Sequence, residues 1–228
     1  NVEYDYMRTE GKLTDALWGY ECLGYYNSQD EIDNAEAKSS FGTVKPGDLK
    51  YKDQNGDGVI DSKDRVVIGR WSAKFTGGMN LTLKYKNFTL FAMLTGQFGG
   101  NAIKNDTYNW VYGERKYSDV VLGAWTENKY KNGEAITYPR LTTQSGDNNF
   151  NTSDYWMYST DRIDLSRVQL TYDFSKSLFG DKALVKGLQV YVNGSSLLTI
   201  AGERKQMERN VGSAPQTRSF TIGAKVEF

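Results

Sequence analysis

The chain has 228 residues, with 28 basic and 28 acidic side chains, no histidine, one cysteine and 14% aromatic residues. Nucleic-acid binding needs clustered lysines and arginines, so the balanced charge excludes nucleic acid as an expected partner. The absence of histidine excludes Ser-His-Asp triads, histidine acid/base catalysis and histidine-containing zinc sites. Because Cys22 has no second cysteine to pair with, no disulfide is expected within the chain. We therefore do not expect an enzyme.

The composition favours an all-β protein. Sixteen Tyr, ten Phe and five Trp residues stand among 23 Gly, which suits many strands joined by polar turns. No segment approaches the ~18 to 20 consecutive apolar residues of a membrane-spanning helix. A transmembrane β-barrel stays possible, because its strands alternate lipid-facing and lumen-facing residues and so keep the mean hydropathy low.

The first feature in chain order is a polar, acidic stretch at residues 27–64, which we expect to be a long connection with little core. Within it, residues 53–64 follow the spacing of an EF-hand calcium loop, with oxygen ligands at positions 1, 3, 5, 7, 9 and 12 and glycine at position 6. The predicted ligands are Asp53, Asn55, Asp57, the backbone carbonyl of Val59, Asp61 and Asp64. Asp64 replaces the usual glutamate at position 12, which could weaken calcium binding or favour magnesium. The alternative is an Asn/Asp/Gly turn cluster that binds no metal.

Residues 71–99 are expected to form a β-hairpin. Apolar and polar residues alternate in two runs, about 73–85 and 88–98, which are separated by Lys86-Asn87. Each run exceeds the ~9 to 11 residues that a tilted strand needs to cross a bilayer.

Residues 99–154 form a long segment without sustained periodicity, rich in aromatic side chains. Aromatic rings can stack on sugars or grip a partner protein, so four of them are candidate substrate or partner residues. These are Tyr108, Trp110, Tyr112 and Trp125. The favoured alternative is that they pack the segment against itself.

Residues 155–228 are expected to supply the last three strands. Ile163 and Leu165 share one alternation phase and Val168 and Leu170 the other, which predicts a β-bulge near Ser166-Arg167. The connections alternate in length, with a tight turn at 86–87, a long loop at 99–154, a moderate turn at about 175–187 and a long polar loop at 201–216, as in outer-membrane barrels. An aromatic girdle is expected from Tyr85, Phe88, Tyr172, Phe174 and Phe228. Possible lumen-facing residues are Lys84, Arg167, Gln169 and Asn193, and we favour their being satisfied by neighbouring strands and water.

These motifs resemble the C-terminal part of the SusC/RagA family of TonB-dependent outer-membrane transporters. The resemblance covers most of the chain, in order. It is carried by Gly47-Asp48-Leu49-Lys50-Tyr51, the acidic loop from Asp53, Ile68-Gly69, Gly77-Gly78, Tyr155-Trp156-Met157, Arg162 to Tyr172, Val190 to Gly194, and Arg218 to Gly223 with the ending at Phe228.

The resemblance implies a 22-stranded antiparallel transmembrane β-barrel, of which this chain would supply about the last five or six strands, the plug domain lying outside it. It also implies import of oligosaccharides or peptides across the Gram-negative outer membrane, with extracellular loops and a periplasmic C-terminus. The implied partners are a SusD-like surface lipoprotein, the TonB complex that energises uptake, the rest of the barrel and plug, outer-membrane lipid, and the barrel-assembly machinery. A dimer of transporter–lipoprotein pairs is implied as well. The alternating end of the chain resembles the assembly signal, with Phe220, Ile222, Val226 and Phe228 as its residues.

Two rival interpretations remain. A secreted calcium-binding β-sandwich, such as a lectin or adhesin, would share the strands and the acidic loop. A glycosidase with paired carboxylates is less well supported, because the Asp and Glu residues fall mainly in loops with no visible pairing.

Overall fold

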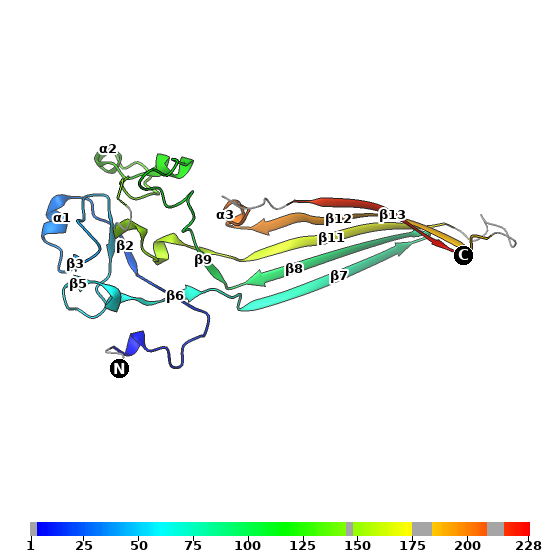
Figure 1. The fold of residues 1–228 in the computed structure, drawn as a ribbon, viewed down its shortest axis with the longest axis horizontal. Helices are drawn as coiled ribbons and strands as arrows, with labels where there is room; N and C mark the ends of the chain where they lie inside the picture. The colour runs from blue at the N-terminus through cyan, green and yellow to red at the C-terminus, as the bar shows by residue number, and fades with distance from the viewer. Residues whose placement is uncertain (1–3, 145–147, 175–183, 209–216) are drawn as a thin grey trace. The chain divides into compact units, whose positions relative to one another are not determined.

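The computed structural model describes residues 4–144, 148–174, 184–208 and 217–228. These residues belong to two compact units (Figure 1). Asn1–Ser72 and Asn101–Tyr158 form the first, here called the loop unit, and Ala73–Gly100 and Ser159–Phe228 form the second, the sheet unit. The connections expected at about 175–187 and 201–216 lie in large part outside the described residues.

The sheet unit is a five-stranded antiparallel sheet in the order β13-β12-β11-β8-β7, so neighbours along the chain are also neighbours in space. Its strands are β7 (Phe75–Tyr85), β8 (Phe88–Phe98), β11 (Arg162–Asp173), β12 (Gly187–Ala201) and β13 (Ser219–Glu227). The short helix α3 (Arg204–Met207) follows β12. The expected hairpin corresponds to β7 and β8, and the all-β prediction is confirmed.

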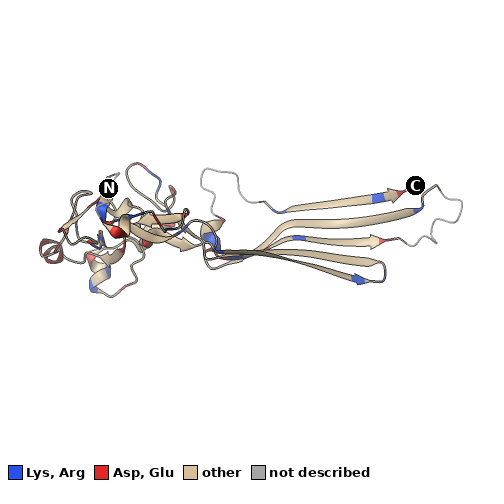
Figure 2. Ribbon diagram, turned by 90° about the horizontal axis from the view of Figure 1, so that it is seen from below, with Lys and Arg blue, Asp and Glu red and all other residues tan. Residues whose placement is uncertain are grey.

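The two faces of this sheet differ in polarity, because side chains alternate between faces and the five strands keep their alternation in register. One row across all five strands consists of Leu83, Leu90, Leu170, Val192 and Ile222. The adjacent row on the opposite face consists of Thr82, Phe91, Gln169, Asn193 and Thr221. We call these the apolar face and the polar face. In Figure 2 the long strands carry few charged residues between their ends.

The predicted β-bulge is confirmed. The register of β11 shifts between Leu165 and Arg167 against both neighbouring strands. Against β8, the extra residue is Ser166 of β11. Against β12, the extra residue lies in β12, opposite Ser166. Ser196, in the irregular part of β12, has a φ of 55°. Because of these bulges, the apolar side chains before and after Ser166 lie on the same face of the sheet, although the alternation in the sequence changes phase there.

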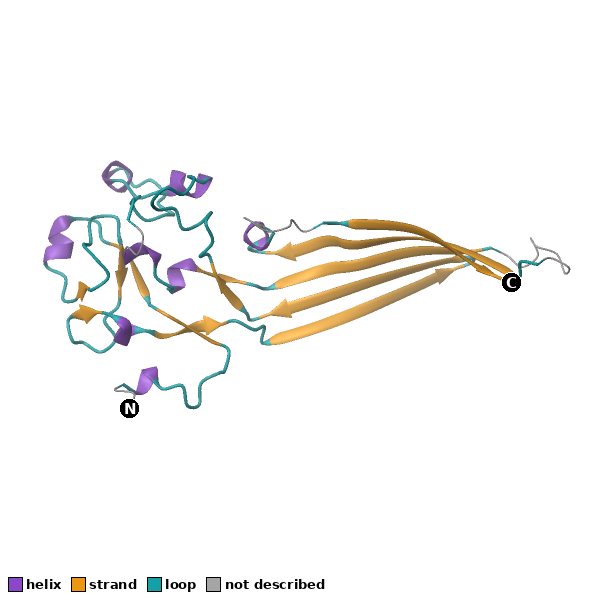
Figure 3. Cartoon of the chain, viewed as in Figure 1, coloured by secondary structure: helices purple, strands orange, loops and turns teal. Residues whose placement is uncertain are grey.

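The loop unit is built from short paired strands and loops (Figure 3). Its strand pairs are β1 (Ala16–Gly19) with β6 (Val66–Arg70), β2 (Cys22–Tyr25) with β4 (Leu49–Tyr51), β3 (Lys38–Ser39) with β5 (Val59–Ile60), and β9 (Asn101–Ile103) with β10 (Met157–Ser159). Its helices are α1 (Gln29–Asp33) and α2 (Glu127–Lys131), with 3₁₀ turns at η1 (Asp5–Met7), η2 (Ser62–Asp64), η3 (Asp119–Gly123), η4 (Asn148–Phe150) and η5 (Asp154–Trp156). No described helix exceeds five residues, and none could cross a membrane.

The expectation that residues 27–64 carry little core is wrong. Leu49, Tyr51 and Ile60 are buried, and they belong to a cluster that extends to Leu17 and Trp156. Segments far apart in sequence thus share one hydrophobic core. Periodicity could not reveal it, because each short strand contributes only one or two of the buried side chains.

Candidate functional site

The four predicted aromatic binding residues all make contacts inside the loop unit. The Trp110 ring lies 5.9 Å from that of Phe150 and 6.1 Å from that of Trp156, and Tyr112 lies 4.9 Å from Phe150. Trp125 is 9% exposed, and Tyr108 donates a hydrogen bond to Asp119. These contacts fit the favoured packing alternative, and a role in substrate or partner binding stays a prediction.

A buried ionic network joins the acidic stretch to the aromatic segment. The Asp48 carboxylate is fully buried, accepts a hydrogen bond of 2.7 Å from Asn149 Nδ2, and lies 2.6 Å from Arg140 Nε. Its other oxygen accepts from the Lys45 backbone N–H at 2.8 Å. Burial raises the pKa of Asp48, and these donors act in the opposite direction. The network holds together residues almost a hundred positions apart.

Gly47 provides a test of how Trp125 is positioned. Gly47 has a φ of +93°, and a Cβ there would overlap the Trp125 ring and the Arg140 side chain. We expect Gly47→Ala to destabilise the loop unit by about 2–5 kcal/mol, through backbone strain and steric overlap. Gly133→Ala is the control, because Gly133 has a similar φ of +65° with open space around it. Hydrogen exchange of residues 44–50 and 122–126 in the purified protein measures the effect, and equal losses of protection in the two variants would contradict it.

The acidic loop, residues 53–64, is closed by hydrogen bonds from its own backbone. Asp53 accepts from the N–H groups of Gly56 at 2.7 Å and Gly58 at 2.9 Å, and Asp57 accepts from Val59 at 2.9 Å. Gly58 has a φ of +81°, which is the sharp turn required at position 6 of this loop type.

Asp64 closes the loop at its far end. Its oxygens accept from the N–H groups of Gln54 and Asp61, each at 2.8 Å, and its side chain is fully buried. Burial raises the pKa of Asp64. The predicted ligands of the acidic loop are all hard oxygen atoms, which suit calcium. Among the described residues, however, no three Asp, Glu, His or Cys side chains are arranged so that they could hold a metal ion. The metal assignment therefore stays a prediction.

The apolar face of the sheet unit is exposed across all five strands. Leu83, Leu170 and Ile222 are exposed by 54%, 46% and 77%. Soluble proteins rarely expose contiguous apolar patches larger than a few hundred Å², so a face this wide indicates an apolar environment or a covering partner. The predicted assembly residues Phe220, Ile222 and Val226 belong to this face in the β13 register, and Phe228 is 69% exposed. Their role in assembly stays a prediction.

Aromatic side chains mark both ends of the apolar face. At one end Tyr85 is paired with Phe88, whose ring lies 4.7 Å from that of Tyr172. At the other end the rings of Phe75 and Phe98 lie 6.4 Å apart. Two aromatic belts separated by an apolar band are the pattern of a wall that crosses a bilayer.

The polar face carries a chain of side-chain hydrogen bonds. Arg167 donates to Asn193 at 2.8 Å and to Gln169 at 2.7 Å, and Gln169 donates to Thr171 at 3.1 Å. This agrees with the expectation that Arg167, Gln169 and Asn193 are satisfied by neighbouring strands.

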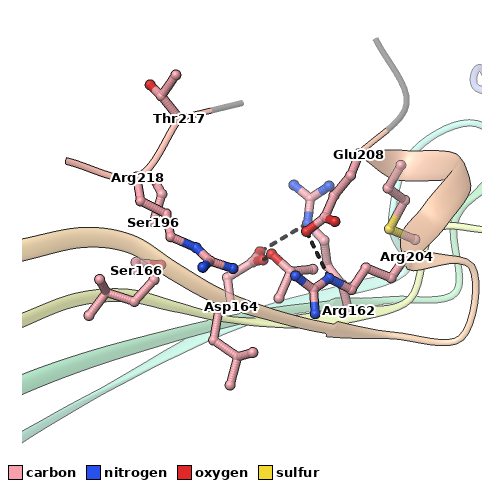
Figure 4. A pocket seen from close by; sticks show the side chains of 12 residues that line it. Arg162, Asp164, Ser166, Ser196, Arg204, Glu208, Thr217 and Arg218 are labelled. Atoms are coloured by element: carbon pink, nitrogen blue, oxygen red, sulfur yellow. Dashed lines mark hydrogen bonds and ion pairs between the residues drawn. The ribbon is translucent and has the colours of Figure 1, made fainter. Parts of the chain in front are cut away.

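A pocket that the sequence pattern did not predict lies in the sheet unit (Figure 4). It is lined by residues of β11, β12, α3 and the segment before β13, including Arg162, Asp164, Arg204, Glu208 and Arg218. The only signal in the sequence was the phase change at Ser166, which places a bulge beside these residues.

The chain is similar to curated proteins over nearly its whole length. It is 24% identical over 239 residues to TonB-dependent receptor P3 of Formosa agariphila, covering 96% of this chain and 22% of that protein. It is 28% identical over 238 residues to TonB-dependent receptor P26 of the same organism, covering 96% of this chain and 23% of that protein. With TonB-dependent receptor SusC of Bacteroides thetaiotaomicron it shares 23% identity over 216 residues, 92% of this chain and 20% of SusC. The chain thus spans about a fifth of the length of these relatives.

The fold is similar to solved structures of the RagAB peptide importer. The 'open-open' state matches with a TM-score of 0.67 and 21% sequence identity, covering 93% of this chain and 22% of that chain. The 'closed-closed' state matches with a TM-score of 0.65. No model of a known protein family matches the sequence.

Proposed function

We infer that this chain, a relative of the TonB-dependent receptors over almost its whole length, forms part of the β-barrel of an outer-membrane importer. The observation that carries the inference is the apolar face, which five strands share in register. In a barrel that face meets lipid and the polar face lines the lumen. Because open sheet edges cannot exist in lipid, further strands of the same protein would pair with β7 and β13, giving the 22-stranded barrel.

The orientation follows from the lengths of the connections. The tight turn at Lys86-Asn87 and the end at Phe228 would be periplasmic, and the loop unit would be extracellular, since such barrels have short periplasmic turns and long outer loops. The importer would take up oligosaccharides or peptides together with a SusD-like lipoprotein. Two of these transporter–lipoprotein pairs would form a dimer, and TonB would supply the energy for uptake. The similarity to SusC and to the RagAB peptide importer supports these assignments.

The β-sandwich lectin or adhesin is not favoured. A sandwich buries the apolar face of one sheet beneath a second sheet. Among the described residues only short two-stranded pairs exist besides the five-stranded sheet, and the apolar face is exposed. The function proposed is transport, without a chemical reaction on the substrate.

Cell fractionation tests the proposed function. The full-length protein is expected in the outer-membrane fraction of its Gram-negative host, and it should need detergent to stay monomeric and folded. Deleting the gene should abolish growth on the nutrient that the protein imports, and adding back the intact gene should restore that growth. A full-length protein that is secreted and remains a folded monomer without detergent would overturn the proposal.

We also propose that the acidic loop binds calcium through Asp53, Asn55, Asp57, Val59, Asp61 and Asp64, with magnesium as the competing ion. The cation would replace the backbone N–H groups that now bind the Asp53 and Asp57 carboxylates. Calcium would stabilise the extracellular loop rather than act as a sensor, because the loop is not flanked by a helix pair.

Calorimetry on the purified receptor tests the calcium proposal. Asp57→Ala is expected to remove one equivalent of bound calcium, because it takes away a carboxylate at position 5 of the loop. Glu134→Ala, which removes an exposed carboxylate outside the acidic loop, should leave the stoichiometry unchanged. An unchanged stoichiometry in Asp57→Ala would mean that the acidic loop is a turn cluster without a metal.

A further inference from the structure

The pocket at the end of the polar face has the size and charge of a ligand site. Its volume is about 680 Å³, within the range of small-molecule pockets. It lies where β11 begins and β12 ends, next to the long connections, and a second pocket of about 380 Å³ shares Arg162 and Asp164 with it. Together the two pockets would suit an elongated ligand.

Three arginines and two carboxylates line this pocket, and four of the five charges pair with one another. Arg162 Nε lies 3.0 Å from an Asp164 oxygen, and Arg204 Nε lies 2.8 Å from a Glu208 oxygen. Thr199 adds a hydrogen bond of 2.6 Å to Asp164. The acidic groups are thus compensated within the pocket.

Arg218 is the remaining charge. None of the hydrogen bonds and ion pairs found among the described residues involves it. Its side chain extends into the pocket on the side of Asp164 (Figure 4). Arginine presents a planar fork of N–H donors that matches a carboxylate, so the geometry provides a donor for an anionic ligand.

The backbone around the pocket departs from a regular sheet. The bulges in β11 and β12 bring Ser166 and Ser196 to the pocket, and Ser196 has a positive φ of 55°, which is uncommon for a residue other than glycine. The Ser166 hydroxyl is held at 2.8 Å from that of Thr95. Bulges and residues in sparsely populated conformations concentrate at binding sites.

We propose that this pocket binds a carboxylate group of the imported ligand through Arg218. The proposal rests on the proposed function, since only in a closed barrel does the polar face line a transport path. None of the twelve lining residues is aromatic, so the pocket lacks the rings on which neutral sugars stack. A peptide with a free C-terminus and an oligosaccharide of uronic acids both supply the carboxylate, and the experiment separates these two sources.

The experiment measures binding to the purified full-length receptor with four probes. These are an oligopeptide with a free C-terminus, the same peptide amidated, an oligogalacturonate, and a neutral galactose oligomer. At least one carboxylate probe should bind more tightly than its neutral counterpart, and Arg218→Gln should weaken that binding about tenfold, the lower end for a charge-assisted hydrogen bond. Arg218→Lys should restore part of the affinity. Raising the salt concentration should weaken binding of the charged probe alone.

Lys225→Gln is the matched control. Lys225 lies on the polar face near the far end of β13, paired with Gln189 and outside the pocket, and its replacement removes the same net charge. Preference for the peptide carboxylate assigns a peptide ligand, and preference for the uronate assigns an acidic sugar. If neither carboxylate probe is preferred, or if Arg218→Gln binds as well as Lys225→Gln, the proposal is wrong. Nutrient uptake by the unmodified strain is measured in parallel, so a receptor that imports without carboxylate preference contradicts this proposal and leaves the proposed function standing.

Discussion

If the proposed function is right, Leu81→Arg is expected to prevent most of the full-length protein from assembling in the outer membrane. Leu81 lies near the middle of β7 on the apolar face and is 45% exposed. An arginine on the lipid side near the bilayer midplane costs about 2–4 kcal/mol, because its charge loses hydration that lipid cannot replace. Thr82→Arg is the control, since Thr82 is the next residue and belongs to the polar face.

The amount of folded receptor in outer-membrane fractions measures both Leu81→Arg and Thr82→Arg. The control should assemble close to the wild-type level, because a wet lumen tolerates charge. Similar defects in the two variants would show that the two faces do not meet lipid and water as proposed. A defect confined to Thr82→Arg would reverse the assignment of the faces.

Asp48→Ala is expected to open the loop unit while leaving the sheet unit folded. The change removes the partner of Arg140, whose side chain is only 19% exposed, and it leaves Asn149 and the Lys45 N–H without their acceptor. Removing one member of a buried ion pair typically costs 3–5 kcal/mol, and we expect about 3 kcal/mol here because Arg140 keeps some contact with water.

Hydrogen exchange of the purified receptor measures this loss. Residues 44–51 and 138–144 should exchange faster in Asp48→Ala, whereas β8 and β11 should keep their protection. The double variant of Asp48→Ala and Arg140→Ala should be less destabilised than the sum of the two single variants, since neither charge is then left alone. Additive losses would indicate that Asp48 and Arg140 do not interact.

Prediction from the sequence worked best in the sheet unit. Strand side chains repeat with a period of two, so alternation along β7, β8 and β13 identified both the strands and the residues that share a face. The phase change near Ser166 was equally visible, because a bulge adds one residue and interrupts the period. The acidic loop was recognised from its spacing, since the main-chain turns depend on glycine and Asx residues that the sequence displays.

Prediction failed where the structure depends on contacts between distant residues. The core of the loop unit combines Leu17, Ile60 and Trp156, which lie in short segments without periodicity. The pocket of the sheet unit combines β11 with residues that follow β12, and its residues Arg204 and Glu208 lie in the segment 201–216, which the sequence indicated only as a long connection. In both cases the local pattern carries no information about which segments meet.

The sequence by itself determined the all-β class, the two faces of the sheet, the bulge and the calcium-type spacing, because each depends on residues that are near neighbours along the chain. Only the tertiary structure decided that the polar connections form a unit with its own core and a buried Asp48–Arg140 pair. It also decided which charges in the pocket are compensated and which one, Arg218, faces the space a ligand would fill. Burial and charge pairing depend on the three-dimensional neighbours of a side chain, and those neighbours come from segments that folding brings together.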